Sequence, residues 1–276
     1  MYLELANLFQ EEIESLRDNY NEFRQNPQIC RNMPPVSGRI KWIRQYYKRI
    51  EEPMNILKEK ASVIAAPKMR RVIRMYNALT TVFVEYEVLY HKAWYRNVVQ
   101  VKTFLTLPLL AMNPRTGRIM INFDPYIMEA IQETECMWKL GLSVPNVAQI
   151  ITFSKKKIMT DYENVRSLVK MNDNIRLSIP SLFIPMMKPV LMKLDKAFQP
   201  GLSTITWTSM EIPKFCENLE EVLDDAKDFV KEASGLVCYR LVAWLPRSPD
   251  LTSLEFLLWG NVGMLVYATP VNDEKN

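Results

Sequence analysis

Apolar and polar positions alternate with the period of an α-helix from the beginning of the chain. One set of apolar residues lies three or four positions apart and so shares one helix face: Leu5, Phe9, Ile13, Leu16, Tyr20 and Phe23. Asn26 and Pro27 predict the end of this first amphipathic helix.

A second stripe follows the segment RNMPPVSG, which is rich in turn formers and is predicted to be a loop. The members of this stripe are Ile40, Ile43, Tyr47, Ile50 and Met54. The pair Glu52-Pro53 predicts the end of this helix, because the residue before a proline is pushed out of the α region.

The longest stripe runs from Lys68 to Pro108 without a glycine or proline in between. Its members are Ile73, Tyr76, Leu79, Phe83, Tyr90 and Trp94. We predict one helix of roughly 35 to 40 residues and about 50 Å. Such a helix is more natural in an elongated stack of helices than in a compact globule.

The period changes between about residues 105 and 123. The segments FLTLPLLAM and RIMINF flank the turn NPRTG, in which Gly117 can adopt a positive φ, so we predict one β-hairpin. Asp124 and Pro125 then predict the N-cap and first turn of a helix that ends at Gly141. Its apolar positions are Ile127, Ala130, Ile131 and Met137.

Three further helices are predicted. The first starts after Pro145 and continues to Pro180 along the stripe Val147, Ile151, Ile158, Tyr162, Val165 and Val169. The second covers residues 183–198, and the connector GLSTITWTS leads from it to the third, for which Ser209 is the predicted cap. The third carries Ile212, Phe215, Leu219, Val222, Ala226, Phe229 and Val230.

Helical periodicity is nearly lost after about Ser234. We therefore predict a helical region over residues 1–233 and an unrelated, poorly ordered tail over residues 234–276, with a protease-resistant core ending near residue 233. The fold class is mainly α: an elongated bundle of long amphipathic helices with one small β-hairpin and an irregular C-terminal tail.

The composition fits a folded helical protein, with 48% hydrophobic residues, 24% charged residues and only 7 glycines in 276. The 35 basic and 31 acidic residues are mixed along the chain and give a net charge of +4, which argues against nucleic acid as a partner. The basic run Lys155–Lys157 points in three directions on a helix, so we expect a solvated surface. No signal peptide and no apolar window of about 20 residues occurs, so neither secretion nor a membrane span is predicted.

The residues that could carry chemistry form no recognisable site. The chain has no phosphate-binding loop of the G-x-x-x-x-G-K-[ST] type and no G-x-S-x-G motif, and His91 is its only histidine, which favours a packing role. The carboxylates Glu133, Glu135, Asp224 and Asp225 are expected on solvated helix faces. The aromatic series Tyr76, Phe83, Tyr86, Tyr90, Trp94 and Tyr95 has helical spacing and is expected in the core.

Four widely spaced cysteines match neither a zinc site nor a disulfide framework: Cys30, Cys136, Cys216 and Cys238. We expect reduced thiols in a cytoplasmic protein. No catalytic, cofactor-binding or metal-binding residue is predicted, and no cofactor.

Several segments resemble the tail of dynein heavy chains, most closely the axonemal outer-arm kind, over roughly Leu3 to Ala233. In RNMPPVSGRIKWIRQYYKRIEEPM, a Pro-Pro-x-x-Gly loop leads into a helix bearing tryptophan and arginine. The segments VEYEVLYHKAWYRNV, INFDPYIMEAIQETECMWKLGLSVP and GLSTITWTS follow in the family's order.

This resemblance implies a helical structural module from the stem of a microtubule motor that drives ciliary movement. The family's tail joins heavy chains to one another, docks dynein intermediate and light chains, and anchors the arm to the axoneme, a cytoskeletal structure of the cilium. The family's motor ATPase regions are absent from this chain, so no enzyme activity is expected.

The C-terminal segment WLPRSPDLTSLEFLLWGNVGMLVYATP instead resembles the end of the catalytic domain of mariner-like transposases. Glu255 falls where that family places a metal-binding carboxylate, but the other acidic ligands that paired metal ions need are missing. An insertion or a fusion of unrelated exons would explain the change. The alternatives to a dynein module are a transposase-derived DNA-acting enzyme and an inert or dominant-negative truncated product.

Overall fold

The structure is a computed structural model that describes residues 2–29, 31–59, 67–180 and 183–242. It is mainly α-helical with one small antiparallel sheet, which confirms the predicted fold class. Contacts divide the chain into two compact units. The first comprises Met1–Leu105 and Asp124–Lys156, and the second Thr106–Phe123 and Lys157–Asn276.

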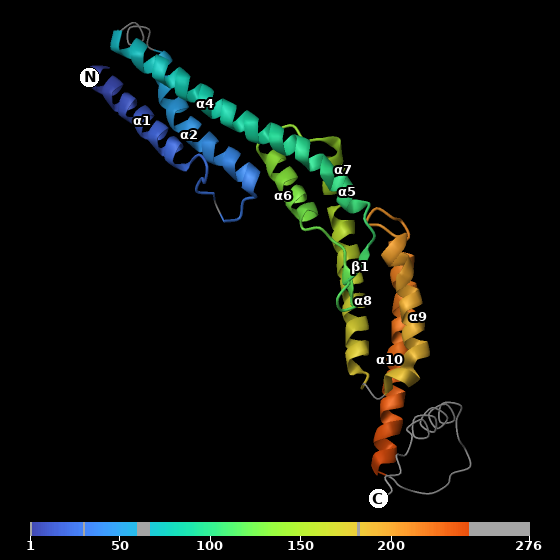
Figure 1. Cartoon of the computed structure of the whole chain (residues 1–276). Coiled ribbons are helices and arrows are strands. Elements are labelled where there is room, and N and C mark those ends of the chain that lie inside the picture. The colour runs from blue at the N-terminus through green and yellow to red at the C-terminus, as the bar shows by residue number, and fades with distance from the viewer. Residues whose placement is uncertain (1, 30, 60–66, 181–182, 243–276) are drawn as a thin grey trace, which may run out of the picture. The chain divides into compact units, whose positions relative to one another are not determined.

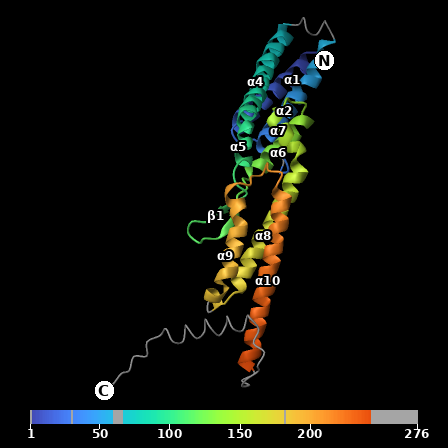
Figure 2. The same cartoon turned by 90° about the vertical axis from the view of Figure 1, so that its right-hand side faces the viewer.

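The first unit is built around one long helix. Its elements, in chain order, are α1 (Tyr2–Phe23), α2 (Pro35–Lys58), α4 (Pro67–Asn97), the 3₁₀ turn η1 (Val98–Gln100), α5 (Val101–Leu105), α6 (Tyr126–Lys139) and α7 (Asn146–Phe153). Helices α1 and α2 lie along the same side of α4 (Figures 1 and 2). All three helices were predicted from their apolar stripes.

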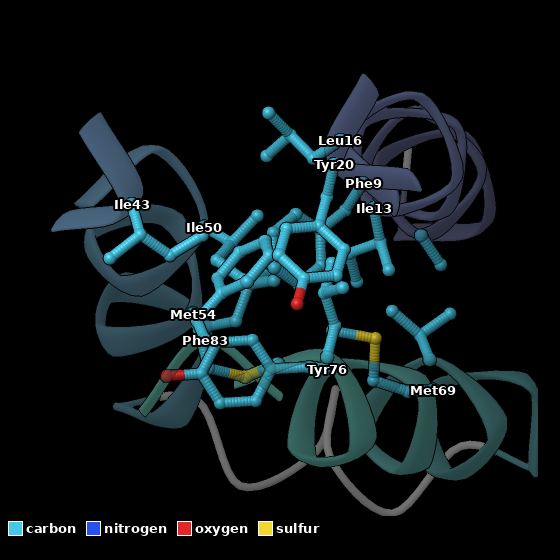
Figure 3. Packing of buried hydrophobic residues seen from close by; sticks show 14 of the residues in the cluster. Phe9, Ile13, Leu16, Tyr20, Ile43, Ile50, Met54, Met69, Tyr76 and Phe83 are labelled. Carbon is cyan, nitrogen blue, oxygen red and sulfur yellow. The ribbon is translucent and has the colours of Figure 1, made fainter. Parts of the chain in front are cut away.

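The stripes of α1, α2 and α4 face one another and form the core of this unit (Figure 3). Ile13 and Leu16 of α1, Ile50 of α2 and Phe83 of α4 are almost completely buried there. Tyr20 of α1 lies edge-on or tilted against two α4 rings, at centroid distances of 5.5 Å to Phe83 and 5.8 Å to Tyr86. Burial of one such side chain stabilises the folded state by about 1.5–3 kcal/mol.

Both predicted ends of the second helix are wrong. Helix α2 begins at Pro35, inside the segment expected to be a loop, and it continues through Pro53 to Lys58. Pro35 fits the first helical position because its fixed φ suits a helix and its missing N–H has no intrahelical role there. The helix continues past Pro53 because Met54 and Leu57 are buried in the core.

The predicted single helix after Lys68 is interrupted. Helix α4 ends at Asn97, and the turn η1 connects it to α5. Val98 and Val101 are both fully buried and three positions apart. A 3₁₀ turn aligns residues at this spacing, so it keeps both valines in the core.

Helix α6 has the predicted caps. The Asp124 carboxylate Oδ1 accepts a hydrogen bond from the Tyr126 N–H at 2.8 Å. Gly141 has a φ of 71° after the last turn, and the Leu142 N–H donates to the Met137 carbonyl at 3.0 Å. These are the bonds of a Schellman end, which requires a residue that tolerates positive φ.

In the part that the structure describes, the second unit contains the predicted hairpin and three helices. Strands β1 (Leu110–Met112) and β2 (Ile119–Ile121) pair antiparallel, with Leu110 opposite Ile121, and Gly117 in their turn has a φ of 66°. Nearly all of α8 (Lys155–Ser178), α9 (Ile184–Ser203) and α10 (Ile212–Val242) belongs to this unit. Gly201 of α9 lies so close to Leu110 and Phe215 that a Cβ there would come within 2.8 Å of each.

Three details differ from the prediction in this half of the chain. The helix expected from Pro145 to Pro180 is two helices, α7 and α8, because Ser154 leaves the α region with φ −84° and ψ 1°. Helix α9 continues through Pro200 to Ser203. Ser209 does not cap the last helix: its Oγ accepts the Thr206 N–H at 3.0 Å and closes the turn before α10.

Helix α10 continues past the predicted boundary at Ser234 as far as Val242, the last residue that the structure describes. The change of family at that boundary stays a prediction. Residues 243–276, with Glu255 among them, lie outside the described residues.

Candidate interaction site

The Pro-Pro-x-x-Gly motif, residues 34–38, forms the start of α2 and is held by a carboxylate from α6. The Val36 N–H donates to Glu133 Oε1 at 2.6 Å, and the Ser37 N–H donates to Glu133 Oε2 at 2.8 Å. These are two of the N–H groups that a helix leaves without intrahelical partners. Glu133 therefore caps α2 although it lies 96 residues beyond Ser37.

The expectation that Glu133 is on a solvated face is wrong, since its exposed fraction is 1%. Burial raises the pKa of the Glu133 carboxyl, and the hydrogen bonds from Val36 and Ser37 partly oppose this shift. The sequence held a signal for this burial. Glu133 follows Ala130 by three positions and precedes Met137 by four, so it lies on the buried stripe of α6.

Gly38 of the motif is required by a close contact. A Cβ on Gly38 would lie 2.3 Å from Cγ2 of Ile29 and 3.4 Å from Cβ of Met33. A larger residue fits there only if the side chain of Ile29 moves. The glycine thus fixes how the loop packs against the first turn of α2.

Arg39 and Trp42, on the next turn of α2, contact α1, α4 and the loop between α1 and α2. Arg39 Nη1 donates to the Gln25 carbonyl at 3.0 Å, and its guanidinium lies 5.1 Å from the centre of the Tyr90 ring. The Trp42 ring stacks on Tyr20 with a centroid distance of 6.2 Å and meets the Tyr86 ring edge-on at 5.8 Å.

Arg44 links three helices. Its Nε and Nη2 donate to the two carboxylate oxygens of Glu87 on α4 at 2.8 and 2.6 Å, and its Nη1 donates to the Leu140 carbonyl at the end of α6 at 2.5 Å. The hydrogen bond to Glu87 raises the pKa of the Arg44 guanidinium. A fork-shaped guanidinium suits this arrangement, because lysine could not bond both oxygens in the same plane.

Two grooves flank this network. The first has a volume of about 380 Å³ and lies between α2 and α4, with Ile43, Tyr47 and Phe83 as apolar walls and Arg44, Glu51 and Glu87 as polar ones. The second has a volume of about 630 Å³ and lies between the motif and α6, beside Arg31, Pro34, Glu129 and Lys139.

The described residues place no group of three or more His, Cys, Asp or Glu side chains where they could hold a metal ion. Burial raises the pKa of Tyr76 and of Tyr86 to about 12, so both phenols are protonated near neutral pH. Among the described helices, none is long and apolar enough to span a membrane. That the chain has no catalytic residue stays a prediction.

The other residues singled out in the sequence have structural surroundings. His91 donates from Nε2 to the Ser143 carbonyl at 2.8 Å and lies beside Trp94. Lys155 is ion-paired with Glu135 at 2.7 Å. Asp225 is exposed and pairs with Lys193 at 3.0 Å, as expected of a solvated face.

The predicted core role of the aromatic series holds for Tyr76, Phe83, Tyr86 and Trp94, which are buried. Tyr90 is half-buried, and Tyr95 is 41% exposed, so it does not belong to the core. Cys136 and Cys216 are free thiols, as predicted. The side chains of Cys30 and Cys238 lie outside what the structure describes.

These contacts define the class of protein: a helical structural module in which residues in and near the Pro-Pro-x-x-Gly motif bond α2 to α4 and α6. Comparison with protein families identifies it further. The sequence-family model described as "Dynein heavy chain, N-terminal region 1" matches residues 1–215. The chain therefore belongs to this family. The recognition of a dynein heavy chain tail is thereby confirmed.

Curated relatives are axonemal. The chain is 35% identical over 225 residues to dynein axonemal heavy chain 8 of Homo sapiens, with 82% of this chain covered. It is 31% identical to dynein axonemal heavy chain 5 of Mus musculus, with 90% covered, and 28% identical to the flagellar outer-arm dynein gamma chain of Chlamydomonas reinhardtii, with 85% covered. The alignments span only 5–6% of the length of these relatives.

Proposed function

We propose that this chain is a docking segment in the stem of an axonemal dynein heavy chain. It associates with other heavy chains and with dynein intermediate and light chains, and it acts in the axoneme of a cilium. It performs no catalysis of its own. The observation that carries this proposal is the family match over residues 1–215.

The arrangement of the first unit supports a mechanical role. A force-bearing stem needs helices that keep their mutual positions, and side chains that bond across helices provide this. Glu133 joins α6 to α2, while Arg44 joins α2 to α4 and to the end of α6. The names of the relatives, which refer to axonemes and to a flagellar outer arm, support the ciliary location.

The proposal is tested by capture from an axonemal extract. The purified full chain is immobilised and exposed to proteins that high salt releases from axonemes, and the bound proteins are identified by mass spectrometry. We expect enrichment of dynein intermediate and light chains over a matrix that carries the heat-denatured chain. A folded chain that enriches none of them would refute the proposal.

A further inference from the structure

We propose that the side of α4 turned away from α1 and α2 binds an acidic amphipathic helix of a partner protein. This side, called the outer face, has an apolar centre made by Val82, Val88, Leu89 and Tyr95. Arg70, Arg71 and Arg74 precede this centre along the helix, and Lys92 and Arg96 lie at its C-terminal end. The inference deepens the docking function proposed above and rests on it.

The helical period separates the outer face from the core. Met69, Val72, Tyr76, Phe83 and Tyr86 are buried on the side of α4 that α1 and α2 cover. Arg70 and Arg74 are one turn apart on the opposite side, and Val88 lies five turns beyond Arg70 in the same direction. Figures 1 and 2 show α1 and α2 on one side of α4 only.

The apolar centre is exposed within the unit. The exposed fractions are 37% for Val82, 40% for Val88, 66% for Leu89 and 41% for Tyr95. Val82 and Leu89 are seven residues apart, and so are Val88 and Tyr95. Each pair therefore forms a short apolar row two helical turns long, one row along each edge of the outer face.

The cations of the outer face have no function in the fold that the structure describes. Arg70, Arg71 and Arg74 are exposed, and no described residue forms an ion pair or hydrogen bond with them. They lie in the first two turns of α4, where the helix dipole disfavours positive charge, and the first turn has no acidic residue. An anionic partner would relieve this unfavourable placement.

The charge pattern specifies the partner. Lys92 and Arg96 lie one turn apart, before and after Tyr95, at the C-terminal end of the apolar centre. Glu85, between Val82 and Val88, is the one acidic residue on the outer face of α4, all of which is described. Arg74 and Arg96 are 22 positions apart in the sequence, which is about 33 Å along the helix. A partner helix of about this length with an apolar stripe and acidic residues toward both ends matches the outer face.

A membrane surface fits less well. Interfacial helices bury a large apolar face that includes tryptophan, phenylalanine and several leucines. The outer face offers one leucine, two valines and one tyrosine, and its helix is already packed on α1 and α2. Anionic vesicles therefore serve as a contrasting probe.

The test uses the full chain and a fluorescent probe peptide of four heptads, with leucine at the a and d positions and glutamate at the outer positions of the first and last heptads. We expect the probe to bind, and a peptide of the same composition in scrambled order to bind at least tenfold more weakly. The substitutions Arg70→Glu, Arg71→Glu and Arg74→Glu together should lower the affinity for the probe at least tenfold. Leu89→Glu alone should do the same.

The matched control carries Lys188→Glu, Lys196→Glu and Lys214→Glu, which change the net charge equally at exposed positions of the second unit. It should change probe affinity less than twofold, and circular dichroism establishes that each variant is folded. Equal binding of the scrambled peptide, or an equal loss in the control, would overturn the proposal. Binding of vesicles with anionic lipid but not of the probe would assign the outer face to a membrane instead.

The same variants separate this inference from the docking function itself. If the chain captures dynein intermediate chains and the triple arginine variant captures them equally well, the outer face is not their docking site and the inference fails. The docking function would then stand. If the wild-type chain captures none, the docking function fails, and the peptide measurement still decides whether the outer face binds an acidic helix.

Discussion

Glu133 joins two parts of the first unit that are far apart in the sequence. Both of its carboxylate oxygens accept N–H groups from the start of α2, and the positive end of the helix dipole lies at the same place. Glu133→Ala removes both acceptors and leaves two N–H groups with no partner. We expect a loss of about 2–4 kcal/mol in the free energy of unfolding, measured by urea denaturation.

Glu129 provides the control for this substitution, because it is exposed on the same helix and has no hydrogen-bond partner among the described residues. Glu129→Ala should change the free energy of unfolding by less than about 0.5 kcal/mol. Equal effects of the two substitutions would show that the bonds to Val36 and Ser37 contribute nothing.

The raised pKa of Glu133 predicts the sign of a pH effect. Below its ordinary value of 4.5, the carboxyl is protonated in both the folded and the unfolded chain. As pH rises from 4.5 to the raised pKa, the unfolded state releases its proton first, so Glu133 makes the wild type less stable. Glu133→Gln does not titrate, so the stability of the wild type relative to this variant should fall across that window. A rising difference would contradict the burial of the carboxyl.

Cys216 of α10 should react slowly with alkylating reagents. Burial raises the pKa of its thiol to about 11, and Asp161, Glu220 and Glu217 add to the shift. At pH 8 on the order of one thiol in a thousand is ionised, and the thiolate is the reactive form. Peptide mass spectrometry after iodoacetamide treatment should show the partly exposed Cys136 modified first. Equal rates in the folded chain would contradict this prediction.

Single residues were the hardest features to predict from the sequence. The caps Asp124 and Gly141 were found because capping depends on a few neighbouring positions. Glu133 was missed because its partners lie almost one hundred positions earlier, and only the fold brings them together. Arg44 was missed for the same reason, since its partners Glu87 and Leu140 are far away in the sequence.

At the scale of elements, one close contact, between Gly38 and Ile29, packs the loop between α1 and α2 against the start of α2. Gly38→Ala would place a methyl group 2.3 Å from Ile29 Cγ2. The overlap should destabilise the chain by about 1–3 kcal/mol, measured by thermal and urea unfolding.

A double-mutant cycle tests the cause of that loss. Ile29→Ala removes the side chain that Gly38→Ala would strike, so the double variant should lose less stability than the sum of the two single variants. If the losses in free energy of unfolding of the two single variants add in full in the double variant, the effect of Gly38→Ala does not come from the contact with Ile29.

Apolar periodicity predicted most helices and the hairpin, because one face of each must be buried. The errors occur where local and tertiary preferences conflict. A proline inside a helix costs about 3 kcal/mol, and burial of a side chain such as Met54 or Leu57 returns about 1.5–3 kcal/mol each. Burial of these two residues together offsets the cost of Pro53, so α2 continues through it. Similarly, no apolar position distinguishes one helix from two at Ser154, where the chain separates α7 from α8.

At the scale of the whole molecule, family membership and helical class follow from long stretches of sequence and were therefore predictable. The surfaces that bind other proteins were not, since an apolar stripe facing the core and one facing a partner look alike in a sequence. The structure separates the two sides of α4, with Phe83 buried and Leu89 66% exposed.

The most direct test of the account is binding between purified components. The full chain is mixed at micromolar concentration with a purified axonemal dynein intermediate chain and light chain complex, and the masses in solution are measured by mass photometry. A docking segment predicts a stoichiometric complex that contains the chain. A correctly folded chain that stays separate under these conditions would contradict the central claim.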